Sequence, residues 1–204
     1  MKNVITLVTM ILLAICCSAQ GDILVYNGSR TTSYAQNDNP VDSMGTDKAK
    51  GYFILDVTYT NGEITAVNNA AYVEYGKDEN GKWADVNLFD FTVERFESND
   101  TVQYAFVVGE NTMSGISMLI IHGQAVSQNI GNADPNEAPK KMNLNYMEYE
   151  ADDSVNVTSG SLKINSSITK DANANNATIE EVYDSIREAI EDKGYTGLPA
   201  DLPE

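Results

Sequence analysis

Oxygen-bearing side chains alternate along a short stretch near the C-terminus, in the spacing that calcium loops use. Asp171, Asn173 and Asn175 match the first three ligand positions of an EF-hand-type loop, and a predicted helix follows soon afterwards. The position that would complete the coordination is Val182 instead of a glutamate. The sequence therefore predicts a candidate calcium site at these three residues, with an ordinary polar linker as the alternative. The acidic cluster Glu148–Asp153 is a second candidate for calcium.

The only histidine of the chain, His122, lies within the apolar run Ser114–Val126, which reads SGISMLIIHGQAV. A run this rich in Ile and Leu, bounded by glycines, predicts a buried central strand. An imidazole there could act as a general base or as a metal ligand. No second histidine exists to build a His-pair metal site, so a packed structural histidine is the favoured alternative.

The single tryptophan, Trp83, and eleven tyrosines could form an aromatic surface that stacks against sugar rings. Half-buried packing on a strand is the alternative. Two long polar segments, Ser29–Lys50 and Ser127–Lys141, are predicted as loops that could form the rim of a site. Trp83 and His122 are thus the candidate binding residues, and the partner stays open between a small ligand, a glycan and a protein.

Motifs of the common enzyme classes are absent from the chain. It has no Gly-x-Ser-x-Gly elbow, no His-Glu-x-x-His, no phosphate-binding glycine loop and no dinucleotide fingerprint. No catalytic residue is therefore predicted. A hydrolase that uses His122 or a pair of carboxylates is kept as an alternative, because such groups assemble from distant parts of a chain.

The first residues are typical of an export signal. Lys2 precedes the apolar stretch Val4–Ile15, and Cys17-Ser18-Ala19 fits a small-x-small cleavage site, which predicts a signal peptide over residues 1–19. A lipoprotein modified at Cys16 or Cys17 is the alternative. Both cysteines lie in this segment, so the predicted mature chain has no disulfide. We expect a secreted or periplasmic protein, of bacterial type, with no transmembrane segment in the mature chain.

The chain is strongly acidic, with 30 acidic residues, 13 basic residues and a formal net charge of −17. Such a surface repels nucleic acid and anionic membranes. Calcium and cationic partners remain compatible with it. The charge therefore argues against a nucleic-acid-binding protein, and a merely soluble surface is its simplest interpretation.

Alternating apolar and polar residues predict strands through most of the chain. In Gly51–Thr60 the apolar residues share one face, and Asn61-Gly62 then predicts a tight hairpin into Glu63–Tyr75. The alternation slips within Lys82–Phe96, which predicts a bulge or bend near Leu88–Phe89. Further strands are predicted at Asp22–Tyr26, Thr101–Val108, Met142–Tyr149 and Ser161–Ile168.

One helix is predicted near the C-terminus, at about residues 179–193. Thr178 and Glu181 have the spacing of a capping box, and Lys193-Gly194 is a typical helix end. An apolar stripe at helical spacing runs along it and must pack on the sheet: Ile179, Val182, Tyr183, Ile186 and Ile190.

These elements predict one domain over residues 20–204, an all-β and mainly antiparallel fold of eight or nine strands with one C-terminal α-helix. A barrel, a half-barrel and a sandwich are all compatible with the pattern. The predicted function is a non-enzymatic β domain outside the cytoplasm, with a binding or structural role. A small-ligand-binding barrel and a secreted hydrolase are the alternatives.

Overall fold

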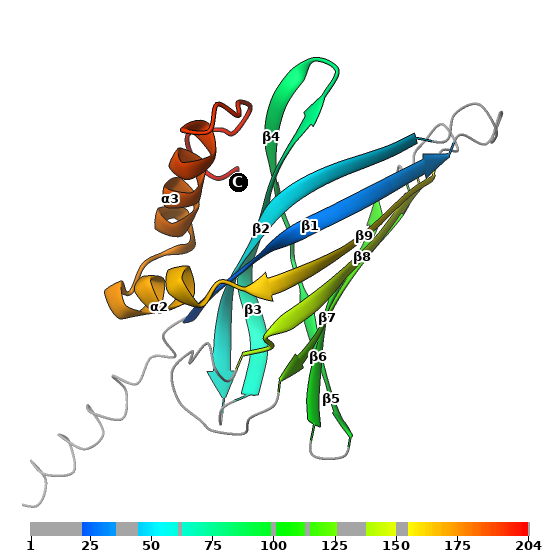
Figure 1. Cartoon of the computed structure of the whole chain (residues 1–204). Coiled ribbons are helices and arrows are strands. Elements are labelled where there is room, and N and C mark those ends of the chain that lie inside the picture. The colour runs from blue at the N-terminus through cyan, green and yellow to red at the C-terminus, as the bar shows by residue number, and fades with distance from the viewer. Residues whose placement is uncertain are drawn as a thin grey trace, which may run out of the picture.

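The computed structural model describes residues 22–35, 45–60, 63–98, 101–112, 115–125, 138–149 and 155–203. One antiparallel sheet of nine strands dominates them, in the order β4-β3-β2-β1-β9-β8-β7-β6-β5 (Figure 1). The strands are β1 Asp22–Ala35, β2 Gly45–Thr60, β3 Glu63–Asp78, β4 Gly81–Leu88, β5 Thr92–Ser98, β6 Thr101–Thr112, β7 Gly115–Ala125, β8 Lys141–Tyr149 and β9 Val155–Ile164. The predicted antiparallel all-β fold with a C-terminal helix is confirmed.

The sheet is open, because its edge strands β4 and β5 are not hydrogen-bonded to each other. The predictions of a closed barrel and of a two-sheet sandwich are therefore wrong for the described residues. The end of β4 and the start of β5 nevertheless lie within about 14 Å of each other, because a link of only three residues, Phe89, Asp90 and Phe91, joins them. The predicted strand Lys82–Phe96 is two strands, and the bulge or bend predicted near Leu88–Phe89 is the end of β4 at Leu88. Its slip in alternation marks the passage of the chain from one edge strand to the other.

Aromatic side chains from distant strands fill the concave face of the curved sheet. The ring centroid of Phe91, in the link, lies 5.6 Å from that of Phe53 on β2 and 6.2 Å from that of Phe106 on β6. Phe53 and Phe106 are fully buried. Leu24, Tyr26, Leu55, Met142 and Leu162 belong to the same cluster. Within the described residues, this face thus holds a packed aromatic core.

The convex face is partly covered by two helices, α2 (Ser166–Asn175) and α3 (Ile179–Glu191). The predicted C-terminal helix is confirmed as α3, including its capping box between Thr178 and Glu181. All five residues of the predicted apolar stripe are buried, and they pack against Ile54, Val73 and Val86 of the sheet. The amphipathic pattern therefore identified both the helix and the surface on which it docks.

The sequence did not predict α2, which begins where the strand Ser161–Ile168 was expected to continue. Its weak apolar pattern is compensated by hydrogen bonds to the start of β1, which extends beyond the end of β9. Thr169 Oγ1 accepts from the Val25 amide at 3.0 Å. The Asn173 side chain accepts from the Ile23 amide at 2.8 Å and donates to the Ile23 carbonyl at 2.9 Å. The helix thus satisfies backbone groups of β1 that no strand reaches.

The two described ends of the predicted loop Ser29–Lys50 are strand, and residues 36–44 lie outside the described part of the chain. β1 runs to Ala35 and β2 begins at Gly45, with Tyr34 opposite Gly45 in the register. The prediction failed because these stretches are polar on both faces and therefore show no apolar alternation. In the second predicted loop, Ser127–Lys141, residues 127–137 lie outside the described part of the chain, as do residues 1–19 of the predicted signal peptide.

The C-terminal tail packs along the edge strand β4. The amide of Ala84 donates to the carbonyl of Thr196 at 2.8 Å, and Tyr183 Oη donates to the carbonyl of Pro199 at 2.6 Å. An exposed edge strand can pair with other chains, so this tail protects β4 from such pairing. Within the described residues, neither helix is long and apolar enough to cross a membrane.

Candidate functional site

A shallow hollow of about 420 Å³ lies on the convex face of the sheet. It crosses strands β3, β2, β1 and β9, and its size falls within the range of small-ligand pockets. Hydroxyl, amide, phenol and ammonium groups surround it. The lining residues are Asn27, Gly28, Ser29, Lys50, Gly51, Tyr52, Tyr75, Ser161 and Lys163.

Gly28 and Gly51, which lie opposite each other in the register, form the floor of the hollow. A Cβ at Gly28 would lie 2.0 Å from the Ser161 carbonyl oxygen, and one at Gly51 would lie 2.6 Å from the ring of Tyr72. Tyr72 belongs to the concave core, so the side chain that Gly51 lacks would point away from the hollow. The floor is therefore bare backbone, and the strands can approach this closely only because glycines stand there.

Three tyrosines connect the hollow to the C-terminal tail. The rings of Tyr52 and Tyr75 stack with centroids 6.4 Å apart, and Tyr195 meets Tyr75 edge-on at 4.9 Å. Burial, together with the neighbouring phenols of Tyr52 and Tyr195, raises the pKa of Tyr75 above its usual value. Its hydroxyl therefore stays neutral at physiological pH, and the ring offers an apolar surface with a polar tip.

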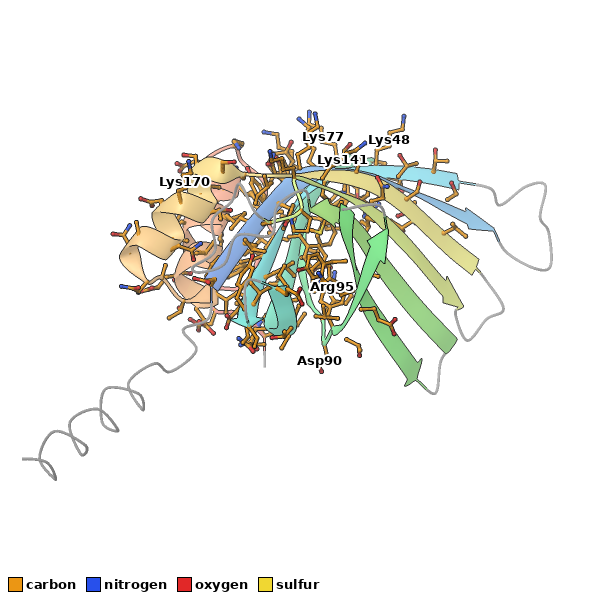
Figure 2. The ribbon with its side chains drawn as sticks, turned by 90° about the horizontal axis from the view of Figure 1, so that it is seen from below. Lys48, Lys77, Asp90, Arg95, Lys141 and Lys170 are labelled. Carbon is orange, nitrogen blue, oxygen red and sulfur yellow. The ribbon has the colours of Figure 1, made fainter. Side chains whose placement is uncertain are left out.

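Five exposed lysines lie on the same face, in and around the hollow: Lys48, Lys50, Lys77, Lys141 and Lys163. Figure 2 shows Lys48, Lys77 and Lys141 extending toward one side of the molecule. None of the ion pairs among the described residues involves a lysine. We call these five lysines, with Tyr52 and Tyr75, the lysine face.

Lysine side chains on this face stand opposite each other across strand pairs. Lys141 on β8 faces Lys163 on β9, and Lys77 on β3 faces Lys82 on β4. Like charges directly opposite each other destabilise a sheet. The protein therefore carries an uncompensated repulsion at Lys141 and Lys163, which a bound anion would relieve.

Carboxylates are absent from the lysine face in the part of the chain that the structure describes. Alternation along β1, β2, β8 and β9 places only neutral side chains between the lysines and tyrosines, beyond the helices. These residues are Asn27, Ser29, Thr31, Ser33, Thr46, Asn143, Val157, Ser159 and Ser161. In a chain with 30 acidic residues, this face is a locally cationic and hydrogen-bonding surface.

Two further lysines nearby stabilise the end of α3 and are excluded from the lysine face. The ammonium of Lys82 donates to the backbone carbonyl of Lys193 and lies 5.0 Å from the ring centroid of Tyr195. The ammonium of Lys193 lies 5.9 Å from the ring centroid of Tyr75. Cations at a helix C-terminus stabilise its exposed carbonyl groups, so these two have a structural role.

On the concave face, acceptors engage four of the five N–H donors of Arg30. Its guanidinium donates to both carboxylate oxygens of Glu74 at 2.6 and 2.8 Å, to Asp47 Oδ2 at 2.7 Å and to Thr32 Oγ1 at 2.9 Å. The side chains of Arg30 and Glu74 are only 10% and 12% exposed. Burial opposes the charge on Arg30, but the carboxylates of Glu74 and Asp47 outweigh it and raise the pKa of the guanidinium. This cluster is an internal ion-pair network, in which the positive charge of Arg30 is already matched by carboxylates.

Trp83, a predicted binding residue, lies beside that network. It is half-buried on β4, and the guanidinium carbon of Arg30 lies 5.9 Å from its ring centroid. The indole packs against Gly76, where a Cβ would lie only 2.8 Å from the ring. These contacts give Trp83 packing partners on the concave face, whereas the hollow is on the convex face. Ligand binding by Trp83 stays a prediction.

His122, the other predicted binding residue, lies on β7 opposite Ala105 of β6 and Asn143 of β8. The predicted strand around it is confirmed, as an interior strand of the sheet. Its side chain lies outside what the structure describes. The described side chains therefore show no site shared by His122 and Trp83, and a role for the imidazole stays a prediction.

The three predicted calcium ligands lie on helix α2, so the predicted loop is wrong. Asn173 is engaged with the backbone of Ile23, and the Asn175 amide donates to the backbone and side chain of Asp171. Asn176, where an EF-hand has glycine, instead ends the helix in the left-handed conformation. Among the described residues, no group of three or more His, Cys, Asp or Glu side chains is placed to hold a metal ion. Calcium binding by Asp171, Asn173 and Asn175 is not tested by this geometry.

The sequence contained one signal for the lysine face that was not recognised. Lys48, Lys50 and Tyr52 alternate with small residues, in the phase opposite to the apolar residues Phe53, Leu55 and Val57. Extending that phase backward would have placed the three side chains on one side of a strand. The segment was instead interpreted as a loop, and the register between strands was needed to bring Lys163 and Tyr75 to the same place.

Comparison with known proteins adds no relative. No protein-family model matches the chain, and no match is found among curated proteins.

Proposed function

We propose that this protein is a non-enzymatic binding domain, exported to the cell exterior or periplasm, that holds an anionic ligand on its lysine face. Lipid attachment at Cys16 or Cys17 is the alternative to free secretion. The observation that supports this function is the Tyr-walled hollow, whose lining contains Lys50 and Lys163 and no carboxylate. A concave site with a few convergent polar groups is the usual form of a ligand pocket.

The groups around the hollow suit a ligand that combines negative charge with hydroxyl groups. Lys50 and Lys163 supply point charges, and Asn27, Ser29 and Ser161 supply neutral donors and acceptors. Tyr52 and Tyr75 add aromatic surface, on which the apolar face of a sugar ring can pack. A sugar acid fits this combination better than a simple inorganic anion.

The net charge of −17 does not oppose such binding at short range. At physiological ionic strength, charges separated by more than about 8 Å are largely screened from each other. A ligand in contact with Lys50 and Lys163 therefore responds to these nearby ammonium groups more than to distant carboxylates. Binding should weaken as salt is added, because its attraction is electrostatic.

The experiment is titration of the purified protein with galacturonate and, in parallel, with neutral galactose, followed by NMR or calorimetry. We expect galacturonate to bind weakly and galactose to bind less. The variant Lys50→Gln/Lys163→Gln should lose about two- to thirty-fold in affinity, taking about 0.2–1 kcal/mol for each exposed charge contact.

The matched control is Lys170→Gln, which removes an exposed lysine on α2, outside the lysine face (Figure 2). It should bind galacturonate as the parent protein does. Equal affinity for galacturonate and galactose, or an equal loss in the Lys170 variant, would contradict an anion site in the hollow.

A further inference from the structure

The lysine face extends beyond the hollow on both sides. Lys141, on β8, and Lys77, on β3, do not line the hollow, yet their side chains lie on the same face as Lys50 and Lys163. Strand β8 is separated from β3 by four strand intervals, through β9, β1 and β2. At about 4.8 Å for each interval, these positions span roughly 19 Å across the sheet.

We propose that the ligand is a linear acidic polysaccharide, a chain of carboxylated or sulfated sugars that lies across the strands. This inference rests on the proposed function, since it assigns the ligand of the same face. One sugar ring packs in the hollow against Tyr52 and Tyr75, and the neighbouring sugars place their acidic groups beside Lys141 at one end and Lys77 at the other.

The type of cation on this face favours acidic sugars over nucleic acid. Arginine is the residue suited to bidentate phosphate recognition, whereas lysine acts as a point charge. All three arginines of the chain are held by carboxylates: Arg30 by Glu74, Arg95 by Glu63 at 2.8 Å, and Arg187 by Asp184 at 3.0 Å. The lysine face therefore offers ammonium point charges together with hydroxyl and amide groups, a set that suits carboxylated or sulfated sugars because these carry both acidic groups and hydroxyl groups.

The same face is poorly suited to a lipid surface. Proteins that bind membranes peripherally insert large apolar side chains below a cationic rim. Among the described residues only Leu88 and Val157 are large, apolar and exposed, and Val157 alone lies on the lysine face. Neutral serine, threonine and asparagine side chains occupy the remaining positions, and they can form hydrogen bonds with sugar hydroxyl groups.

The repulsion between Lys141 and Lys163 agrees with a polymeric ligand. Only one of this pair lines the hollow, so a single sugar acid would neutralise one ammonium group and leave the other. A chain with an acidic group on successive sugars reaches both. Binding of the polymer therefore removes an unfavourable cross-strand interaction that binding of the monomer would leave partly in place.

The test is a length series measured on the purified protein: galacturonate, oligogalacturonates of increasing length, and polygalacturonate, with neutral dextran as the control polymer. We expect affinity to rise with length by roughly tenfold or more over the monomer, because linked contacts add. The variant Lys77→Gln/Lys141→Gln should lose about two- to thirty-fold in affinity for the polymer. Its affinity for the monomer should fall much less, since neither lysine lines the hollow.

Different failures separate this inference from the proposed function. Monomer binding without any gain from chain length would overturn the polysaccharide and leave the anion site intact. Absence of binding to every acidic sugar would overturn both. Tighter binding to a single-stranded oligonucleotide or to anionic lipid vesicles than to polygalacturonate would overturn the polysaccharide in favour of those partners. The Lys170→Gln variant again serves as the control for loss of a lysine outside the lysine face.

Discussion

The two faces of the same strands use their positive charges in opposite ways. Arg30 and Lys50 lie on the paired strands β1 and β2, yet alternation sends one side chain to the concave face and the other to the convex face. Arg30 is almost buried and donates to two carboxylates, whereas Lys50 is exposed and forms no described ion pair. A paired and buried cation holds strands together, while an exposed and unpaired one remains available to a ligand.

The net charge of the whole chain does not describe the local charge of the lysine face. The net charge of −17 predicts repulsion of anions, and this holds for the chain as a whole. Alternation and register nevertheless gather five lysines on one face from four strands, without a described carboxylate between them. Because salt screens distant charges, the charges close to the lysine face decide which ligands can bind there.

The largest expected effect comes from removing the buried cation. Arg30→Met should lower the free energy of unfolding by about 3 kcal/mol, because Glu74 would be left nearly buried without a partner. Chemical denaturation with urea measures this as a lower midpoint at an unchanged slope. Adding Glu74→Leu to the same chain should recover part of the loss, since it removes the unpaired charge.

Lys50→Met is the matched control, with the same loss of one positive charge on the neighbouring strand. We expect its free energy of unfolding to stay within about 0.5 kcal/mol of the parent value, because Lys50 is exposed and has no described ion-pair partner. If Arg30→Met and Lys50→Met destabilised the protein equally, the cations of the two faces would not differ in their contribution to stability.

Patterns of neighbouring residues predicted those elements whose two sides differ in polarity. The hairpin between β2 and β3 was predicted from Asn61-Gly62, and the register with Thr60 opposite Glu63 confirms it. Helix α3 was predicted with its capping box and its buried stripe. In both cases one side packs on a core and the other meets water, so the apolar residues recur with the period of the element.

Elements without that contrast were not predicted. The polar ends of β1 and β2 were interpreted as a loop, and α2, held to β1 by side chains such as Thr169 and Asn173, gave no amphipathic signal. The lysine face was missed for a related reason. Its residues come from strands far apart in sequence, and only the sheet order β3-β2-β1-β9-β8 makes them neighbours.

A smaller effect tests whether the helix layer supports the hollow. Tyr183→Phe removes the 2.6 Å hydrogen bond to the Pro199 carbonyl, which holds the C-terminal tail in place. The same tail carries Tyr195, whose ring packs against Tyr75 of the hollow. We expect a loss of about 1 kcal/mol in the free energy of unfolding and weaker binding of galacturonate. Unchanged binding in a destabilised variant would show that the hollow does not depend on the tail.

The same variant has a signature in alkaline solution. Burial raises the pKa of Tyr183 to about 12. The folded protein thus retains this proton at pH values where the unfolded chain has lost it, so stability is unaffected below about pH 10 and falls as the pH rises from 10 to 12. Tyr183→Phe should make that fall shallower, although Tyr26 and Tyr75, whose pKa values are also raised, still contribute. Thermal melting followed across this range measures the difference.

The smallest expected effect has opposite signs for stability and for binding. Lys141→Glu converts the repulsion with Lys163 into a cross-strand attraction, which should raise the free energy of unfolding by about 0.5 kcal/mol. It also places a carboxylate on the lysine face, so the affinity for polygalacturonate should fall. Urea denaturation and a binding titration on the same sample measure the two changes together.

Lys170→Glu on α2 changes the net charge by the same amount but faces no lysine across a strand, so both of its measurements should stay near the parent values. If Lys141 served only the stability of the fold, replacing it would not raise the free energy of unfolding. If Lys141→Glu were less stable than the parent and bound polygalacturonate equally well, Lys141 would be a structural residue. The convex face would then resemble the concave face, with its charges serving the fold alone.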